Sequence, residues 1–196
     1  VHRDLPFMYN RAMVEPDYFD LVVRNPRYDT TLFATPNTSV GITDFAIGVH
    51  ASTLIKDGGT LQIGIGSLGD AIVYACRLRH EDNLTFRQVA DGLGVDEGLV
   101  DSIGGIGPFE KGLYGCSEMF VNGFFHLRRA GILAREVFED ETLQCLLNEG
   151  QIGSAVNADT LHALIRVGRV GPVLSREDVE YLRRWGIFGA AVELDG

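Results

Sequence analysis

The sequence predicts an α/β fold with a mainly parallel sheet and a helical C-terminal portion. Residues 60–65 alternate aliphatic with small side chains as a strand does, and a glycine-rich loop then leads into an apolar helix that we expect to begin at Asp70. Residues 113–120 predict a second strand, after which Asn122 and Gly123 begin another helix. Strands that alternate with helices are typical of a parallel sheet, because the helix carries the chain back across one face.

The composition favours one folded domain over a disordered chain. Of the 196 residues, 45% are hydrophobic, which is enough to form a core. The 24 glycines are well above ordinary usage, and they fall mostly at the ends of the expected strands and helices, where tight turns need them.

The charge and the cysteines argue against several classes of protein. A formal net charge of −10 disfavours a nucleic-acid surface, which needs clustered Lys and Arg. The three cysteines, Cys76, Cys116 and Cys145, form no C-x-x-C pair, so we expect a reducing, cytoplasmic setting without disulfides or a metal site. No apolar run approaches the roughly 20 residues of a membrane span, so no membrane partner is expected.

Residues 1–40 predict an irregular lead-in. Four prolines recur there at intervals of ten residues with aromatic side chains between them, and proline at this density interrupts both helix and sheet. We expect these aromatics to pack over the domain, with one short helix over residues 16–23. The α/β domain then covers residues 41–196, and its part from residue 137 onward is expected to be mostly helical.

Apolar side chains at helical spacing, followed by glycines, predict the remaining helices. Residues 42–53 have this spacing, and we expect their helix to stop at Gly58 and Gly59. A short helix over 124–130 and a strand over 132–133 come after the second long strand. Three further helices, each followed by a glycine, are expected over residues 141–148, 159–167 and 176–185. The stripe of Val179, Leu182 and Trp185 on the last one predicts core packing.

The glycine loop and Glu118 together suggest acyl-transfer chemistry. A strand–glycine–helix junction aims unpaired backbone N–H groups and the positive end of the helix dipole above the strand, where an anion or a developing oxyanion can sit. Glu118 is an isolated carboxylate in an otherwise weakly polar segment. A set of backbone donors and a lone glutamate are the parts that an acyl-transfer site requires.

The same two stretches resemble a known family. The run DGGTLQIGIG at residues 57–66, followed by Asp70-Ala71, is similar to the acetyl-CoA hydrolase/CoA-transferase family, which includes the 4-hydroxybutyrate and butyrate CoA-transferases. Ser117-Glu118-Met119, with Gly123 just beyond, resembles the motif around the catalytic glutamate of that family. The resemblance covers about residues 42–71 and 113–133.

This resemblance implies a site and a reaction. Glu118 would be the nucleophile and would end up holding coenzyme A as a glutamyl thioester, while Gly64, Gly66, Ser67 and Leu68 would line the oxyanion and CoA-binding loop. The substrates would be a small acyl-CoA and a carboxylate, or water if hydrolysis dominates. The resemblance further implies the sheet of the CoA-transferase superfamily, no permanently bound cofactor and no metal, and it is compatible with a homodimer.

The chain departs from the family pattern in several places. Gly66 and Glu118 lie 52 residues apart, longer than in compact members, so residues 81–112 are interpreted as an insertion. Compact members have a His where this chain has Tyr114-Gly115-Cys116, and an Asp where it has Asn122. Because the later glycine-rich motif has no counterpart and the chain begins at Val1, we expect a piece of a longer protein with little activity alone.

Three other interpretations stay open. Residues 64–69 match the G-x-G-x-x-G pattern of a nucleotide-binding oxidoreductase, but the strand that should position the acid about 20 residues on is missing. The glycines could instead serve only tight helix packing. Residues 86–101 have the rhythm of a helix-turn-helix, yet its second helix is acidic, so a surface helical pair is expected. The C-terminal helices could form a non-catalytic interaction module.

Cys116 is expected to be a small core residue, and His50 is given no role.

Overall fold

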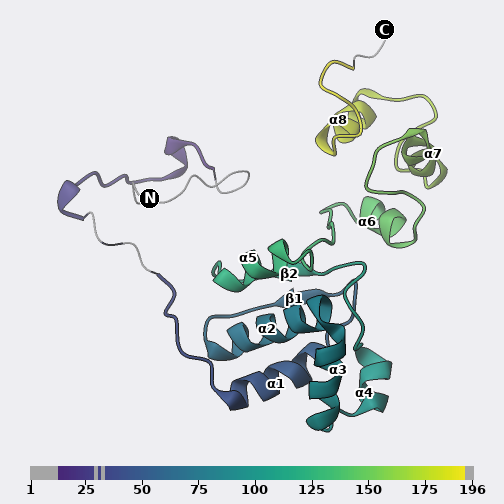
Figure 1. The fold of residues 1–196 in the computed structure, drawn as a ribbon. Coiled ribbons are helices and arrows are strands. Elements are labelled where there is room, and N and C mark those ends of the chain that lie inside the picture. Colours follow the sequence, from purple (N-terminus) through teal and green to yellow (C-terminus); the bar gives the residue numbers. More distant parts are fainter. Residues whose placement is uncertain (1–12, 29–30, 32–33, 193–196) are drawn as a thin grey trace.

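The computed structural model describes residues 13–28, 31 and 34–192 of the chain (Figure 1). It is a mixed α/β structure that is mostly helical. Two short 3-10 helices, Pro16–Tyr18 and Pro26–Tyr28, precede the regular elements. These elements are, in order, α1 Ile42–Thr53, β1 Thr60–Gln62, α2 Ser67–Glu81, α3 Asn83–Gly92, α4 Glu97–Ile103, β2 Tyr114–Cys116, α5 Asn122–Arg129, α6 Glu141–Asn148, α7 Ala158–Arg166 and α8 Arg176–Arg184.

The sheet is parallel, as expected, but within the described residues it has only two strands. β1 pairs with β2 so that Thr60 lies opposite Tyr114 and Gln62 opposite Cys116. The strand expected over 132–133 is wrong, although that segment runs beside β2: the Leu113 N–H donates to the Ile132 carbonyl at 2.6 Å. A larger parallel sheet is therefore not part of the described structure.

The main core lies between this small sheet and the helices α2 and α5. It contains the buried side chains Ile63, Val73, Cys76, Phe109, Leu113, Val121, Phe124, Leu127 and Ile132. Helix α1 packs against the other side of α2 at close range, because Gly48 has no side chain. A Cβ atom at Gly48 would lie 2.7 Å from the Ala71 carbonyl oxygen. Figure 1 shows α2 between α1 and the two strands.

Residues 81–112, interpreted as an insertion, form α3 and α4 and contribute to the core rather than lying on the surface. Phe86 and Ala90 of α3 are fully buried against Val49 of α1 and Ala75 of α2. Because its apolar side chains pack closely against α1 and α2, the segment belongs to the same folded unit as they do. This unit, residues 42–133, is the α/β body. The expectation of a merely superficial helical pair is wrong for α3.

Arg79 joins segments of the α/β body that are far apart in the sequence. Arg79, in the last turn of α2, is only 1% exposed. Its guanidinium donates to the carbonyls of Ser52 at 2.6 Å, Ile55 at 2.8 Å and Gly107 at 2.7 Å. Because Arg79 takes the carbonyls at the end of α1, that helix ends at Thr53 instead of continuing to Gly58.

The three C-terminal helices form where the sequence places them. Each begins at a side-chain cap and ends at a glycine with positive φ: Gly150 at 69°, Gly168 at 73° and Gly186 at 69°. They enclose a core of their own, in which Leu164 and Leu182 are fully buried. The expected core role of the stripe on α8 is confirmed for Val179 and Leu182, and Trp185 packs partly buried beside them.

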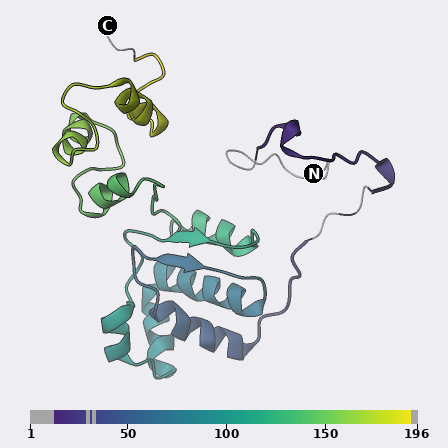
Figure 2. The ribbon, with the colours of Figure 1, turned by 180° about the vertical axis from the view of Figure 1, so that it is seen from behind.

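Residues 13–28 of the lead-in do not pack over the domain. Tyr18 is 72% exposed, and residues 13–28 lie apart from the helices in both ribbon views (Figures 1 and 2). The expected helix over 16–23 is limited to the single turn Pro16–Tyr18. The aromatics Phe7, Tyr9 and Phe33 lie outside the described residues. None of the helices among the described residues is long and apolar enough to cross a membrane.

Candidate functional site

The glycine loop joins β1 to α2 at the carboxyl edge of the sheet. Helix α2 begins at Ser67, three residues earlier than expected, and the Gly66 carbonyl accepts the Asp70 N–H at 3.2 Å. Gly66 has a φ of +122°, a conformation that side chains with a Cβ rarely adopt. A glycine is therefore required at the point where the strand turns into the helix.

The glycines of this loop have different roles. A Cβ at Gly69 would lie 2.6 Å from the Gly64 carbonyl oxygen, so Gly69 allows the helix to pack on the strand end. A Cβ at Gly64 or Gly66 would meet nothing within 4 Å. Tight packing thus explains Gly69 alone, and the backbone at Gly64 and Gly66 borders open space that a ligand can enter.

Glu118 follows the neighbouring strand. The strand expected over 113–120 is shorter, Tyr114–Cys116, and Glu118 lies in the bend between β2 and α5. Its side chain is exposed, and among the described residues it makes no hydrogen bond or ion pair. The weakly polar segment around Glu118 therefore leaves this carboxylate open to water in the chain without ligand, because the bend carries Glu118 out of the core.

The two strand ends are held against each other. The Ile63 N–H donates to the Cys116 carbonyl at 3.3 Å, one residue beyond the ladder. The Ser117 hydroxyl lies 2.7 Å from the Ile63 carbonyl oxygen and can donate to it. Ser117 thus has a positioning role just before Glu118.

The register of the sheet brings the predicted site residues to one edge. Gln62 lies opposite Cys116, so Gly64 and Glu118 each come two residues after a paired position, on adjacent parallel strands. Carboxyl ends of parallel strands lie at the same edge of a sheet, where ligands commonly bind in α/β proteins. Gly66, Ser67 and Leu68 follow at the start of α2.

Both helices that start at this edge lack a side-chain cap. No side chain caps the first N–H groups of α2 after Gly66 or of α5 after Val121. By contrast, five other helices have a capping side chain: Asp82 for α3, Asp96 for α4, Asp140 for α6, Asn157 for α7 and Ser175 for α8. Uncapped N–H groups and two positive helix ends favour a negatively charged or oxyanionic group at this edge.

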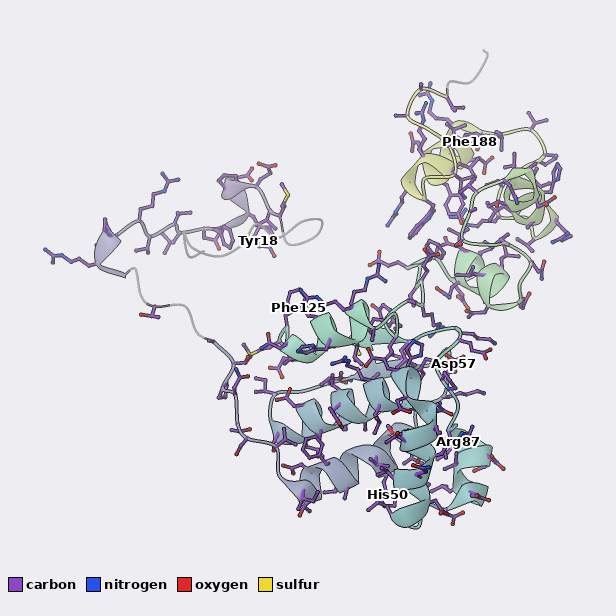
Figure 3. All side chains as sticks on the ribbon, viewed as in Figure 1. Tyr18, His50, Asp57, Arg87, Phe125 and Phe188 are labelled. Atoms are coloured by element: carbon purple, nitrogen blue, oxygen red, sulfur yellow. The ribbon has the colours of Figure 1, made fainter. Side chains whose placement is uncertain are left out.

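Apolar side chains accompany these donors on the surface. Ile65 and Leu68 of the glycine loop, Met119 and Phe120 after Glu118, and Phe125 of α5 are each at least a third exposed. The Phe120 and Phe125 rings pack edge to face, with centroids 4.9 Å apart. Figure 3 shows Phe125 on α5, away from Asp57 at the opposite end of the strands. An apolar group that bound beside Glu118 would find contacts here.

Asp57, part of the motif at residues 57–66, has a structural function. Its carboxylate accepts the backbone N–H groups of Glu110, Lys111 and Gly112 at 2.9–3.1 Å. These bonds hold the segment that enters β2 against the segment that enters β1. Asp57 thereby fixes the register that places Glu118, from the other end of the sheet.

The interpretation as a nucleotide-binding site loses support, and one expectation about a cysteine is wrong. Asp82, the acid that a dinucleotide site would need at the end of a second strand, caps α3 by accepting the Thr85 N–H at 3.2 Å, and residues 81–113 contain no strand. Cys116 is exposed and not a core residue, because β2 ends beside it. His50, which was given no role, is exposed.

Among the described residues, no three His, Cys, Asp or Glu side chains gather as a metal site would require. Comparisons with protein-family models, with curated proteins and with solved structures give no match to this chain.

Proposed function

We propose that this chain carries the catalytic glutamate of an acyl-CoA-dependent enzyme, which transfers CoA from an acyl-CoA to a carboxylate or hydrolyses the acyl-CoA. The observation that carries the proposal is the register of β1 and β2, which brings the uncapped glycine loop and Glu118 to the same edge. The resemblance of both segments to the acetyl-CoA hydrolase/CoA-transferase family supports the same assignment.

The proposed reaction begins when a Glu118 carboxylate oxygen attacks the thioester carbonyl. The carbon–sulfur bond breaks, CoA leaves as a thiolate, and a mixed anhydride of Glu118 and the acyl group forms. The thiolate then attacks the glutamyl carbonyl, which releases the acyl group as a carboxylate and leaves a glutamyl-CoA thioester. An acceptor carboxylate repeats these steps in reverse and departs as the new acyl-CoA, or water hydrolyses the thioester.

Each attack places negative charge on a carbonyl oxygen. Backbone N–H groups at Gly66, Ser67 and Leu68 would stabilise this charge, because they begin α2 and no side chain occupies them. Glu118 is exposed in the chain by itself, so exclusion of water would come from the bound acyl-CoA against the apolar side chains of this edge.

The test replaces Glu118 by Gln in the complete gene product. Glu118→Gln keeps the shape of the side chain and removes its nucleophilic oxygen anion, so we expect CoA exchange between acyl-CoA and carboxylate to fall by several orders of magnitude. Glu110→Gln is the matched control, since Glu110 is also exposed but precedes β2 at the opposite edge.

A trapping experiment identifies the residue directly. Borohydride added during turnover reduces a glutamyl thioester, and the resulting mass change should map to the peptide with Glu118 in the wild type and vanish in Glu118→Gln. Near-normal exchange by this variant, or a label on Cys116, would show that Glu118 is not the nucleophile.

A further inference from the structure

An apolar groove of about 390 Å³ runs between α1, α2 and α3. Its walls include Ile42 and Phe45 of α1, Tyr74 of α2, and Val89 and Leu93 of α3. Several of these side chains remain open to water, with Ile42 85% and Tyr74 54% exposed. Apolar surface of this kind is stabilised when another apolar segment covers it.

The lead-in carries apolar side chains that are exposed as well. Tyr18, Leu21 and Val23 are 72%, 87% and 74% exposed, and Phe19 and Val22 are about half exposed. Figure 3 shows Tyr18 on the part of the chain that lies away from the α/β body. If residues 19–23 are extended, Phe19, Leu21 and Val23 share one face, because alternate side chains of an extended chain point the same way.

The end of the lead-in already lies beside the groove. A second cavity of about 330 Å³ next to the first turns of α2 and α5 is lined by Asn37 and Val40. Phe45 and Tyr74 line both cavities and pack against each other, with ring centroids 5.1 Å apart. The apolar surface is therefore continuous from the end of the lead-in to α3.

The connecting chain is long enough to return to this surface. Eighteen residues lie between Val23 and Ile42, and a chain of that length reaches up to about 60 Å when fully extended. Helix α1, with 12 residues, is about 18 Å long. Any part of the groove is thus within reach of residues 19–23 of the same chain.

We propose that residues 18–23 fold back and cover the groove between α1, α2 and α3 of the same chain. The tether keeps this segment at millimolar effective concentration near the groove, whereas a second copy must overcome repulsion between two chains of net charge −10.

Crosslinking in the full chain tests the proposal. Cys116→Ser and Cys145→Ser remove the exposed thiols and leave Cys76, which is buried. In this background, Leu21→Cys with Val89→Cys should react with a short bismaleimide to give an intramolecular crosslink, identified by mass spectrometry of the joined peptides. The control pair is Leu21→Cys with Val173→Cys, since Val173 is 88% exposed and lies between α7 and α8. We expect at least about tenfold more intramolecular product from the first pair.

Equal yields from the two pairs, or a product of dimer mass, would overturn the proposal; the dimer would mean that the segment covers a second copy. Thermal unfolding gives an independent measurement. Leu21→Glu should lower the Tm by a few degrees if the segment is docked, whereas Val173→Glu should leave it unchanged. An unchanged Tm in Leu21→Glu would also contradict the proposal, and neither result depends on the role of Glu118.

Discussion

The α/β body and the C-terminal helices are stabilised in different ways. In the body, buried contacts join segments far apart in the sequence: Arg79 bonds to carbonyls at Ser52 and Gly107, and Asp57 bonds to the chain at Lys111. The three C-terminal helices instead repeat one local pattern of polar cap, apolar stripe and terminal glycine. The stability of the α/β body therefore depends on a few polar side chains that bond distant segments. The stability of the C-terminal helices depends on many weaker local interactions.

The hydrophobic cores of the two regions share no residue. The single tryptophan, Trp185, packs against the C-terminal core, so its fluorescence reports on that region, while circular dichroism reports on all helices. These two probes can therefore follow the unfolding of each region.

Arg79→Met should destabilise the body most. The three carbonyls that Arg79 satisfies would lose their buried partner, and each unsatisfied group costs about 1–3 kcal/mol. We expect a loss of at least about 3 kcal/mol in urea unfolding followed by circular dichroism, with the Trp185 transition unchanged. Arg77→Met is the control, because Arg77 makes only a partly exposed ion pair with Glu81 at 2.9 Å and should change stability by less than about 1 kcal/mol. A common shift of both transitions would mean that the two regions unfold together.

Leu182→Ala should destabilise the C-terminal helices and leave the stability of the α/β body unchanged. Leu182 is fully buried in the C-terminal core, and removing such a side chain typically costs about 2–5 kcal/mol. The midpoint of the Trp185 fluorescence transition should fall, while most of the circular dichroism change stays at its original denaturant concentration. Val173→Ala, at an exposed position, should leave both unchanged. If Leu182→Ala shifts the body as strongly, the idea of separate cores fails.

Alkaline pH should lower the free energy of unfolding of the α/β body, because the buried thiol of Cys76 ionises. Burial raises the pKa of Cys76 from 9.0 to about 12, and nearby Arg79 offsets this only in part. Since the folded pKa is above the unfolded one, the stabilisation is complete below pH 9 and is lost progressively as the pH rises toward 12. Comparing unfolding free energies of the wild type and Cys76→Ala across this range isolates the effect, and parallel pH profiles would contradict it.

Tyr181 makes the corresponding prediction for the C-terminal helices. Burial, together with the hydrogen bond that its hydroxyl donates to Asp140 at 3.1 Å, raises the pKa of Tyr181. The contribution of Tyr181 to the stability of the C-terminal helices should accordingly begin to decline only above pH 10. The contribution of Cys76 to the stability of the α/β body declines at lower pH. The Trp185 transition of Tyr181→Phe should lack this decline.

Ser175→Ala should have the smallest effect. The Ser175 side chain caps α8 by accepting the Asp178 N–H at 3.2 Å, and the loss of such a cap typically costs about 1 kcal/mol. The change should appear in Trp185 fluorescence and not in the body. Ser175→Asp, which can still cap, should recover most of the stability; a similar loss in both variants would assign the effect to something other than the cap.

The sequence by itself determined the elements whose signals are local. The three C-terminal helices match their predicted bounds within a residue, because caps, apolar stripes and glycines with positive φ act within one or two turns. The strand–glycine–helix junction and a second strand just before α5 could also be predicted. Glu118, expected within that strand, lies in the bend after it, because the strand ends at Cys116.

Only the tertiary structure decided what depends on distant contacts. Three of these contacts join partners more than 20 residues apart, which no local pattern specifies. They are the burial of Arg79, the hydrogen bonds from residues 110–112 to Asp57, and the packing of α3 on α1. The pairing of β1 with β2 is of the same kind, and it alone brings the glycine loop and Glu118 to one edge. Exposure of Glu118 and Cys116 likewise follows from where the ladder ends, because a three-residue strand turns into solvent before the alternation of its side chains can continue.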